Sequence, residues 1–199
     1  MSSALLLSGG IDSIALMYWK RPDYAITIDY GQLPARAELV ASKSAAMVLG
    51  VKHFLIEVNC SGIGSGDLST KKPSNAAPSS EWWPFRNQLL VTLAGAKALE
   101  LGVERLWVGS VLQDGFHRDG TLEFYKHLND LMSYQEGGIQ VQAPAIDFTT
   151  KDLVLKSGIP SSVLFYAHSC HTNNSPCGMC RGCYKYTDTL LQLHEAGWR

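Results

Sequence analysis

A glycine-centred turn lies almost at the start of the chain, between an apolar run at residues 4–7 and a segment with helical character. The turn reads Ser8-Gly9-Gly10-Ile11-Asp12-Ser13. Adjacent glycines let backbone N–H groups converge on an anion because no Cβ blocks the approach, and a helix N-terminus adds partial positive charge. The sequence therefore predicts a strand, a phosphate-binding turn and a helix, which together form the opening unit of an α/β protein.

This turn is not a Walker-type phosphate loop, since no lysine follows its second glycine, and transfer of a γ-phosphate is not indicated. It resembles instead the Ser-Gly-Gly-x-Asp-Ser signature of the PP-loop ATP pyrophosphatases. In that family the turn holds the departing pyrophosphate and leaves the α-phosphate open to attack. The resemblance implies that ATP and Mg²⁺ are bound by Ser8, Gly9, Gly10, Asp12 and Ser13.

The net charge and the hydropathy of the chain exclude several classes of function. A net charge of −1 provides no basic field for duplex nucleic acid, so we expect no binding to double-stranded DNA or RNA. No apolar run approaches the ~20 residues that a membrane-spanning helix needs, and no basic leader precedes the first strand. We therefore expect a cytoplasmic protein without a membrane segment.

Strand-like and helix-like segments alternate along the chain. Strands are expected at 24–28, 53–58, 105–108 and 139–141, and helices at 34–49, 87–101 and 151–156. Strands separated by helices imply a parallel sheet with helices on both faces. We predict an α/β fold, a doubly wound, Rossmann-like sheet of the PP-loop (HUP) type, with residues 1–155 as the ATP pyrophosphatase domain.

One stretch lacks this periodicity. Residues 59–80 are rich in Ser, Gly, Pro, Asn and Lys, and a loop of this length inside a compact domain is usually functional or disordered. Two interpretations stay open, a mobile lid over a substrate and a surface linker. The aromatic side chains that follow at 82–85 suit packing as well as stacking on a flat base.

Four of the five cysteines gather near the C-terminus in the pattern C-x6-C-x2-C-x2-C, at Cys170, Cys177, Cys180 and Cys183. Four thiolates at such spacings are typical of a closed tetrahedral Zn²⁺ site in a reducing compartment. An iron–sulfur cluster on the same thiolates is the alternative. Zinc is favoured because nothing else in the sequence indicates electron transfer. We predict a small helical zinc-binding subdomain at 156–199.

The glycine turn and the cysteine pattern together resemble the QueC family of 7-cyano-7-deazaguanine synthases over most of the chain. Matching pieces between the two motifs are Ile28-Asp29-Tyr30-Gly31-Gln32, Arg86-Asn87, Glu123-Phe124, and Ile146-Asp147 with Lys151. The resemblance implies a ligase that adenylates 7-carboxy-7-deazaguanine with ATP. Ammonia then forms the amide, and a second ATP activates the amide oxygen so that the nitrile can form. Family members are commonly dimeric, so we expect a homodimer.

The same resemblance assigns roles to individual residues. It implies that Asp29 and Gln32 bind the nucleotide, and that Asp12, Ser13 and Lys151 are catalytic. Residues predicted to bind the deazaguanine substrate are Phe85, Arg86, Asn87, Phe116 and His117.

Two segments depart from the family pattern. Phe85 replaces the glycine of Pro-Gly-Arg-Asn, and residues 113–119 replace a Tyr-Pro-Asp-Cys-Arg segment. These changes favour an alternative activity, in which an enzyme similar to the QueC-like proteins of antiphage defence operons conjugates the activated deazaguanine to an amine of a protein partner. A tRNA-modifying PP-loop enzyme and a non-catalytic nucleotide-binding module are further alternatives. The chain lacks the basic patch that a tRNA-modifying enzyme needs to bind RNA. The intact residues Asp12, Ser13 and Lys151 disfavour a non-catalytic module.

Overall fold

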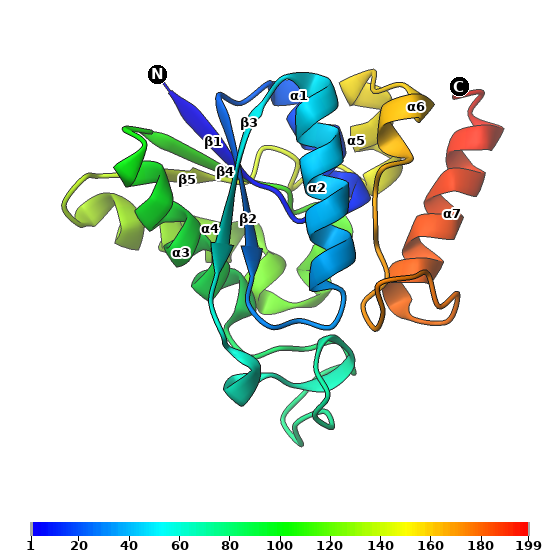
Figure 1. The fold of residues 1–199 in the computed structure, drawn as a ribbon, viewed down its shortest axis with the longest axis horizontal. Coiled ribbons are helices and arrows are strands. Elements are labelled where there is room, and N and C mark those ends of the chain that lie inside the picture. The colour runs from blue at the N-terminus through cyan, green and yellow to red at the C-terminus, as the bar shows by residue number, and fades with distance from the viewer. Residues whose placement is uncertain (1, 199) are drawn as a thin grey trace.

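A sheet of five parallel strands forms the centre of the computed structural model, which describes residues 2–198 (Figure 1). Its order is β3-β2-β1-β4-β5, and each neighbouring pair is parallel. The strands are β1 Ser3–Leu6, β2 Tyr24–Asp29, β3 Lys52–Glu57, β4 Arg105–Val108 and β5 Gln140–Gln142. The α/β class and the parallel sheet expected from the sequence are confirmed.

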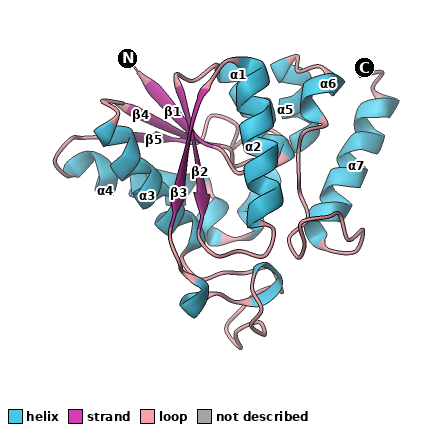
Figure 2. Cartoon of the chain, in the orientation of Figure 1, coloured by secondary structure: helices cyan, strands magenta, loops and turns pink. Residues whose placement is uncertain are grey.

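Helices cover both faces of this sheet (Figure 2). Helices α3 and α4 pack on one face, and α1, α2 and α5 pack on the other together with α6 and α7. The helices are α1 Ile11–Lys20, α2 Ala35–Leu49, α3 Arg86–Glu100, α4 Leu122–Tyr134, α5 Thr150–Ser157, α6 Ser161–Leu164 and α7 Arg181–Glu195. The doubly wound architecture is therefore also confirmed.

The central strand shows why its sequence is apolar throughout. Successive side chains of a strand point to opposite faces, so Ala4 packs in the core with Val91 of α3, and Leu5 packs in the core with Ile14 of α1. Because both faces of β1 are covered, every position from Ala4 to Leu7 must tolerate burial. A continuous apolar run replaces the alternation seen in half-exposed strands.

Two helix ends have the residues that such positions favour. Gly50 ends α2 in a left-handed conformation with φ +67°, which glycine adopts without steric cost. At the start of α5, the Thr149 hydroxyl accepts a hydrogen bond of 3.1 Å from the Asp152 N–H, as an N-cap residue does. Helix α5 itself covers the segment 151–156 that the sequence predicted.

The order of the strands creates a crevice at one end of the sheet. From β1 the chain first builds β2 and β3 on one side, and it then returns to place β4 and β5 on the other side. Ligands of open α/β sheets bind at the carboxyl ends of the strands beside such a reversal. The glycine turn after β1 lies at this point.

The irregular connection between β3 and α3 is packed against the carboxyl end of the sheet (Figure 1). It contains two short 3-10 turns, Ser61–Ile63 and Gly66–Leu68. Leu68 and Trp83 are buried in the same core cluster as the sheet, and the Trp83 ring meets Tyr30 edge-on at 5.0 Å. Trp83 is therefore a packing residue, and the connection is folded onto the sheet through its apolar side chains.

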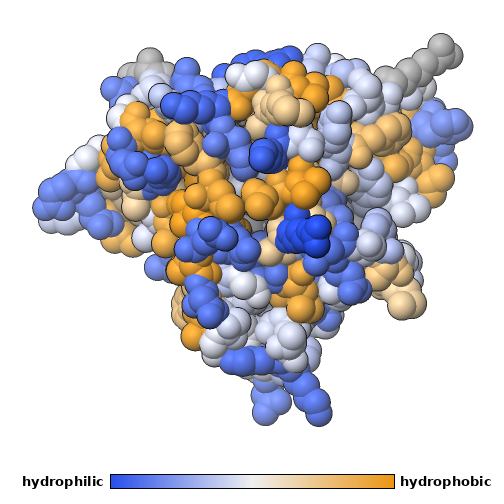
Figure 3. Space-filling model, in the orientation of Figure 1, coloured by the Kyte–Doolittle hydropathy of each residue, from blue (hydrophilic) through white to orange (hydrophobic). Residues whose placement is uncertain are grey.

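Figure 3 shows apolar surface over α2 and the neighbouring edge of the sheet, where Val40, Met47 and Val48 of α2 and Leu55 of β3 are exposed. Among residues 2–198, no helix has both the length and the apolar character that crossing a membrane requires.

Candidate functional site

A cleft of about 650 Å³ opens at the carboxyl ends of the central strands. Ser8 and Gly10 line it after β1, Tyr30 after β2, and Gly109 and Ser110 after β4. The connection between β3 and α3 and the first turns of α7 provide further walls. The cleft therefore occupies the crevice that the strand order creates.

The glycine turn is held by its own serines and by tight packing behind it. Gly9 has φ +77°, and a Cβ there would stand 2.5 Å from the backbone oxygen of Glu38. The Ser8 and Ser13 hydroxyls are 3.1 Å apart, and the Ser13 hydroxyl donates to the Gly10 carbonyl at 3.0 Å. Gly10 is the N-cap of α1, so the turn leads directly into the positive end of a helix, which favours an anion.

Asp12 is a mostly buried carboxylate in the first turn of α1, with its side chain 15% exposed. Burial raises its pKa above the usual value, and the attraction of Lys185 opposes that shift. The Lys185 ammonium lies 2.8 Å from Asp12 Oδ2 and 3.3 Å from Asp114 Oδ1. Asp12 Oδ1 is buried and makes no hydrogen bond within the described residues, and the hydroxyl of Thr150 lies close to the same carboxylate.

A second carboxylate, the half-buried Glu38 of α2, lines the cleft on the β2 side. The Gln32 side-chain amide donates to Glu38 Oε2 at 2.7 Å, and its oxygen accepts from the Tyr30 N–H at 2.9 Å. Partial burial raises the pKa of Glu38 to about 7, against the lowering effects of Gln32 and of the half-buried Arg86. Gln32 therefore connects the turn after β2 to a carboxyl group that changes its charge near neutral pH.

A third acidic group, Glu81, joins the connection before α3 to α7. Arg181 of α7 donates to Glu81 Oε1, and His117 Nε2 lies 3.3 Å from the same oxygen. Burial acts to raise the pKa of Glu81, but hydrogen bonds, including those from Arg181 and His117, outweigh it and lower the pKa to about 2. Glu81 thus remains charged and holds the connection over the cleft.

The structure gathers most residues that the sequence singled out. The cleft is lined by Ser8, Gly10, Asp12, Ser13, Arg86, Asn87, His117 and Lys151. Five others lie outside its lining: Gly9, Asp29, Gln32, Phe85 and Phe116. Gly9 and Gln32 both adjoin Glu38, which lines the cleft. Asp29 accepts a hydrogen bond of 3.0 Å from the Gly31 N–H.

The two aromatic residues expected at the substrate face solvent. Phe85 is 77% exposed and, with φ +55°, precedes α3 in a left-handed conformation that glycine adopts more readily. Phe116 is 60% exposed, and the Arg181 guanidinium lies 4.7 Å from its ring centre. Their roles as substrate contacts stay predictions.

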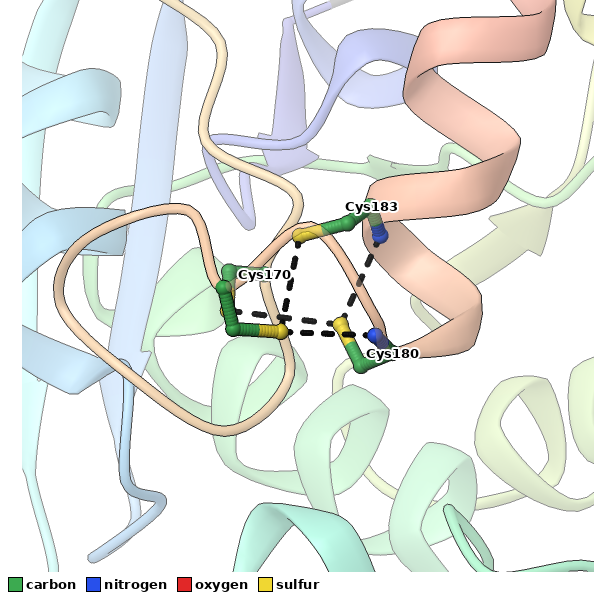
Figure 4. A group of neighbouring side chains, drawn as sticks. Cys170, Cys180 and Cys183 are labelled. Carbon is green, nitrogen blue, oxygen red and sulfur yellow. Dashed lines mark hydrogen bonds between the residues drawn. The ribbon is translucent and has the colours of Figure 1, made fainter.

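The four cysteines come together at the start of α7, as Figure 4 shows for Cys170, Cys180 and Cys183. All four sulfurs lie within 4.8 Å of one another, with Cys177–Cys183 at 3.9 Å and Cys180–Cys170 at 4.0 Å. A tetrahedral zinc ion with Zn–S bonds of about 2.3 Å places its sulfurs about 3.8 Å apart. A multi-iron cluster needs more space between its thiolates, so the arrangement fits one zinc ion.

Backbone N–H groups also point at these sulfurs. The Met179 and Cys180 N–H groups donate to Cys177 Sγ at 3.4 and 3.3 Å, and the Cys183 N–H donates to Cys180 Sγ at 3.4 Å. Such bonds stabilise the thiolate form that binds metal. The donor set and its surroundings are therefore those of a closed metal site.

Several charged residues that line the cleft were not predicted from the sequence: Glu38, Glu81, Asp114, Arg181 and Lys185. Each comes from an element remote in sequence from the glycine turn, so spacing alone gives no indication of their meeting. Only Lys185 could have been found from the sequence. It follows Cys183 by two residues, so the cysteines that position the start of α7 also position Lys185.

Comparison with known proteins identifies the family. Residues 2–194 match the family described as "Queuosine biosynthesis protein QueC". The chain is 30% identical to a 7-cyano-7-deazaguanine synthase of Desulforudis audaxviator over 92% of its own length and 93% of the relative's. It is 27% identical to the enzyme of that name from Methanocaldococcus jannaschii, over 96% and 95% of the two chains.

Among solved structures, the U34-tRNA thiolase NcsA from Methanococcus maripaludis, with its 4Fe-4S cluster, matches with a TM-score of 0.52 and 14% identity. The match covers 98% of this chain and 66% of the thiolase, and it shows a common fold alone. The glycine turn, the sheet order, the cysteine cluster and a family match over nearly the full length agree, and the chain belongs to the QueC family.

Proposed function

We propose that this protein is an ATP-dependent ligase that converts 7-carboxy-7-deazaguanine to 7-cyano-7-deazaguanine with ammonia as the nitrogen source. The observation that carries the proposal is the glycine turn of β1 and α1 at the strand-order reversal, opening onto a cleft of about 650 Å³. Membership of the QueC family and the names of its relatives support the choice of substrate.

ATP would place its β- and γ-phosphates against the turn formed by Ser8, Gly9, Gly10 and Ser13, where a helix N-terminus favours negative charge. Asp12 Oδ1, which is buried and makes no hydrogen bond within residues 2–198, is a suitable oxygen ligand for Mg²⁺. Bound Mg²⁺ would neutralise phosphate charge as pyrophosphate departs. Lys151 also lines the cleft and supplies a further positive charge.

The deazaguanine ring would lie in the apolar part of the cleft. Apolar side chains of Leu6, Ile28, Leu90 and Val108 line the cleft in the region of the β1, β2 and β4 carboxyl ends, where they can pack against a flat ring. Arg86 and Asn87 at the start of α3 offer donors to the substrate carboxylate. Asn87 is itself fixed, because its side-chain amide donates to the Asp119 carbonyl at 2.8 Å.

This arrangement suits activation of an acid. A carboxylate is a poor electrophile until one oxygen carries a good leaving group, and transfer of AMP supplies that group. The chain would hold the acid and the α-phosphate together and stabilise the charge that moves onto pyrophosphate. Ammonia would then displace AMP to form the amide, and a second ATP would activate the amide oxygen, which leaves with AMP as the nitrile forms.

A closed Zn²⁺ site on Cys170, Cys177, Cys180 and Cys183 completes the proposal. It has no open position for substrate, so its contribution is structural. We expect a cytoplasmic homodimer, for which the exposed apolar residues on α2 and β3 offer a contact surface.

Conjugation of the activated deazaguanine to a protein amine is the second candidate. His117 supports it, because this departure from the family pattern does line the cleft. Phe85 does not, because it faces solvent outside the cleft.

Product analysis separates the two candidates. The zinc-loaded protein is incubated with ATP, Mg²⁺ and 7-carboxy-7-deazaguanine, with either ammonium or a candidate polypeptide, and the products are followed by mass spectrometry. We expect the free nitrile and AMP in the ammonium reaction. A mass adduct on the polypeptide, with no amide or nitrile from ammonium, would refute the proposed function in favour of conjugation.

A further inference from the structure

Helix α7 brings a cation to the glycine turn. The Lys185 ammonium lies 2.8 Å from Asp12 Oδ2 and 3.3 Å from Asp114 Oδ1, and the residue lines the cleft. The side chain thus forms ion pairs with two carboxylates at the mouth of the glycine turn.

The hydrogen bonding of Lys185 leaves capacity for a ligand. An ammonium has three donors, and the two carboxylates accept two of them. Its side chain is 28% exposed, so part of it faces the open cleft. Arg181, one helical turn earlier, pairs instead with Glu81. Lys185 is therefore the cation of α7 that faces the phosphate-binding turn.

The cysteine cluster determines where Lys185 lies. Cys180 is the N-cap of α7, and its sulfur accepts from the Cys183 N–H. Gly182, between them, is packed so closely that a Cβ would stand 1.9 Å from the Ser169 carbonyl oxygen. The first turn of α7 is thus fixed within the cluster, and its last cysteine, Cys183, lies two residues before Lys185.

The same cluster adjoins the glycine turn through the backbone. The His168 N–H donates to the Gly9 carbonyl at 2.9 Å, two residues before Cys170. The segment that carries the cysteine cluster therefore contacts the turn and the helix after it at two points. These are the His168–Gly9 backbone hydrogen bond and the Lys185–Asp12 ion pair.

We propose that Lys185 binds the β- and γ-phosphates of the nucleotide and that the metal on the four cysteines holds it in position to do so. The inference rests on the proposed function for the identity of the nucleotide. The metal site then has a structural role at the cleft, because it anchors the helix that carries a phosphate-binding cation.

The test is calorimetric titration of Mg²⁺ with inorganic pyrophosphate, and separately of AMP, into the metal-loaded protein. We expect Lys185→Met to weaken pyrophosphate binding by about tenfold to hundredfold, the effect of losing a charge-assisted contact, and to leave AMP binding within about twofold. Lys185→Arg should recover most of the affinity. Lys156→Met, which removes an exposed lysine of α5, is the matched control and should change neither ligand.

The role of the metal is tested in the same titration. Removing the metal from the wild type with a chelator should weaken pyrophosphate binding as Lys185→Met does, and removing it from Lys185→Met should add little, since both changes act through one contact. Unchanged pyrophosphate affinity in a folded Lys185→Met protein would overturn the inference, as would equal losses for pyrophosphate and AMP. Additive losses would overturn the anchoring role. Because the titration needs no deazaguanine, it is independent of the product analysis.

Discussion

Replacing Gly9 with alanine is expected to lower kcat/KM for ATP at least a hundredfold. Gly9 has φ +77°, and the new Cβ would stand 2.5 Å from the Glu38 backbone oxygen and 3.0 Å from the Ser42 hydroxyl. The left-handed conformation costs an L-residue roughly 1–2 kcal/mol, and backbone atoms cannot move aside cheaply. The turn must therefore shift, and its N–H groups lose their alignment on the phosphates. Steady-state kinetics, with circular dichroism as a check on folding, measures the effect.

Gly50 supplies a matched control for this substitution. Its φ is +67°, similar to that of Gly9, but a Cβ there would meet nothing within 4 Å. Gly50→Ala should cost about 1 kcal/mol of stability and leave kcat/KM unchanged. If Gly9→Ala kept wild-type kinetics, or if both variants lost activity equally, the glycine turn could not be the phosphate site.

Replacing Cys183 with serine is expected to remove the bound metal and to lower the Tm by about 10 °C. Three thiolates and a hydroxyl bind zinc far more weakly than four thiolates, and the N-terminal turn of α7 depends on the cluster for its position. Metal content per chain is measured by elemental analysis after dialysis, and the Tm by differential scanning calorimetry. The metal found in the wild type also decides between zinc and iron.

Cys60 is the control for this substitution because it lies outside the cluster, in the connection between β3 and α3. Cys60→Ser should retain one metal ion per chain and wild-type activity. A Cys183→Ser protein that kept its full metal content and its Tm would contradict the four-cysteine site.

The sequence alone indicated those features that arise from local rules. The glycine turn, the apolar β1 strand and the glycine that ends α2 each follow from the conformational limits of a few adjacent residues. The cysteine spacing similarly predicted one cluster, because two-residue gaps direct thiolates to a common point. These features include much of the phosphate side of the site.

Features that depend on long-range packing were not predictable. Helix α4 was not predicted, although its buried residues Tyr125, Leu128 and Met132 recur at helical spacing. Helix α7 was predicted only as part of a helical subdomain at 156–199, without bounds of its own. The role of Gln32 at the nucleotide stays a prediction, whereas the hydrogen bond from its amide to Glu38 was not predicted, because that contact depends on how α2 packs beside β2. Lys185 meets Asp12 across 173 residues of chain, and no local pattern encodes such a distance.

The most direct test of the central claim is exchange of labelled pyrophosphate into ATP. The zinc-loaded protein is mixed with ATP, Mg²⁺, 7-carboxy-7-deazaguanine and radioactive pyrophosphate, with ammonia left out. Reversible transfer of AMP to the acid predicts that label enters ATP only when the acid is present. Absence of exchange, together with release of ADP and phosphate in place of AMP and pyrophosphate, would contradict the account.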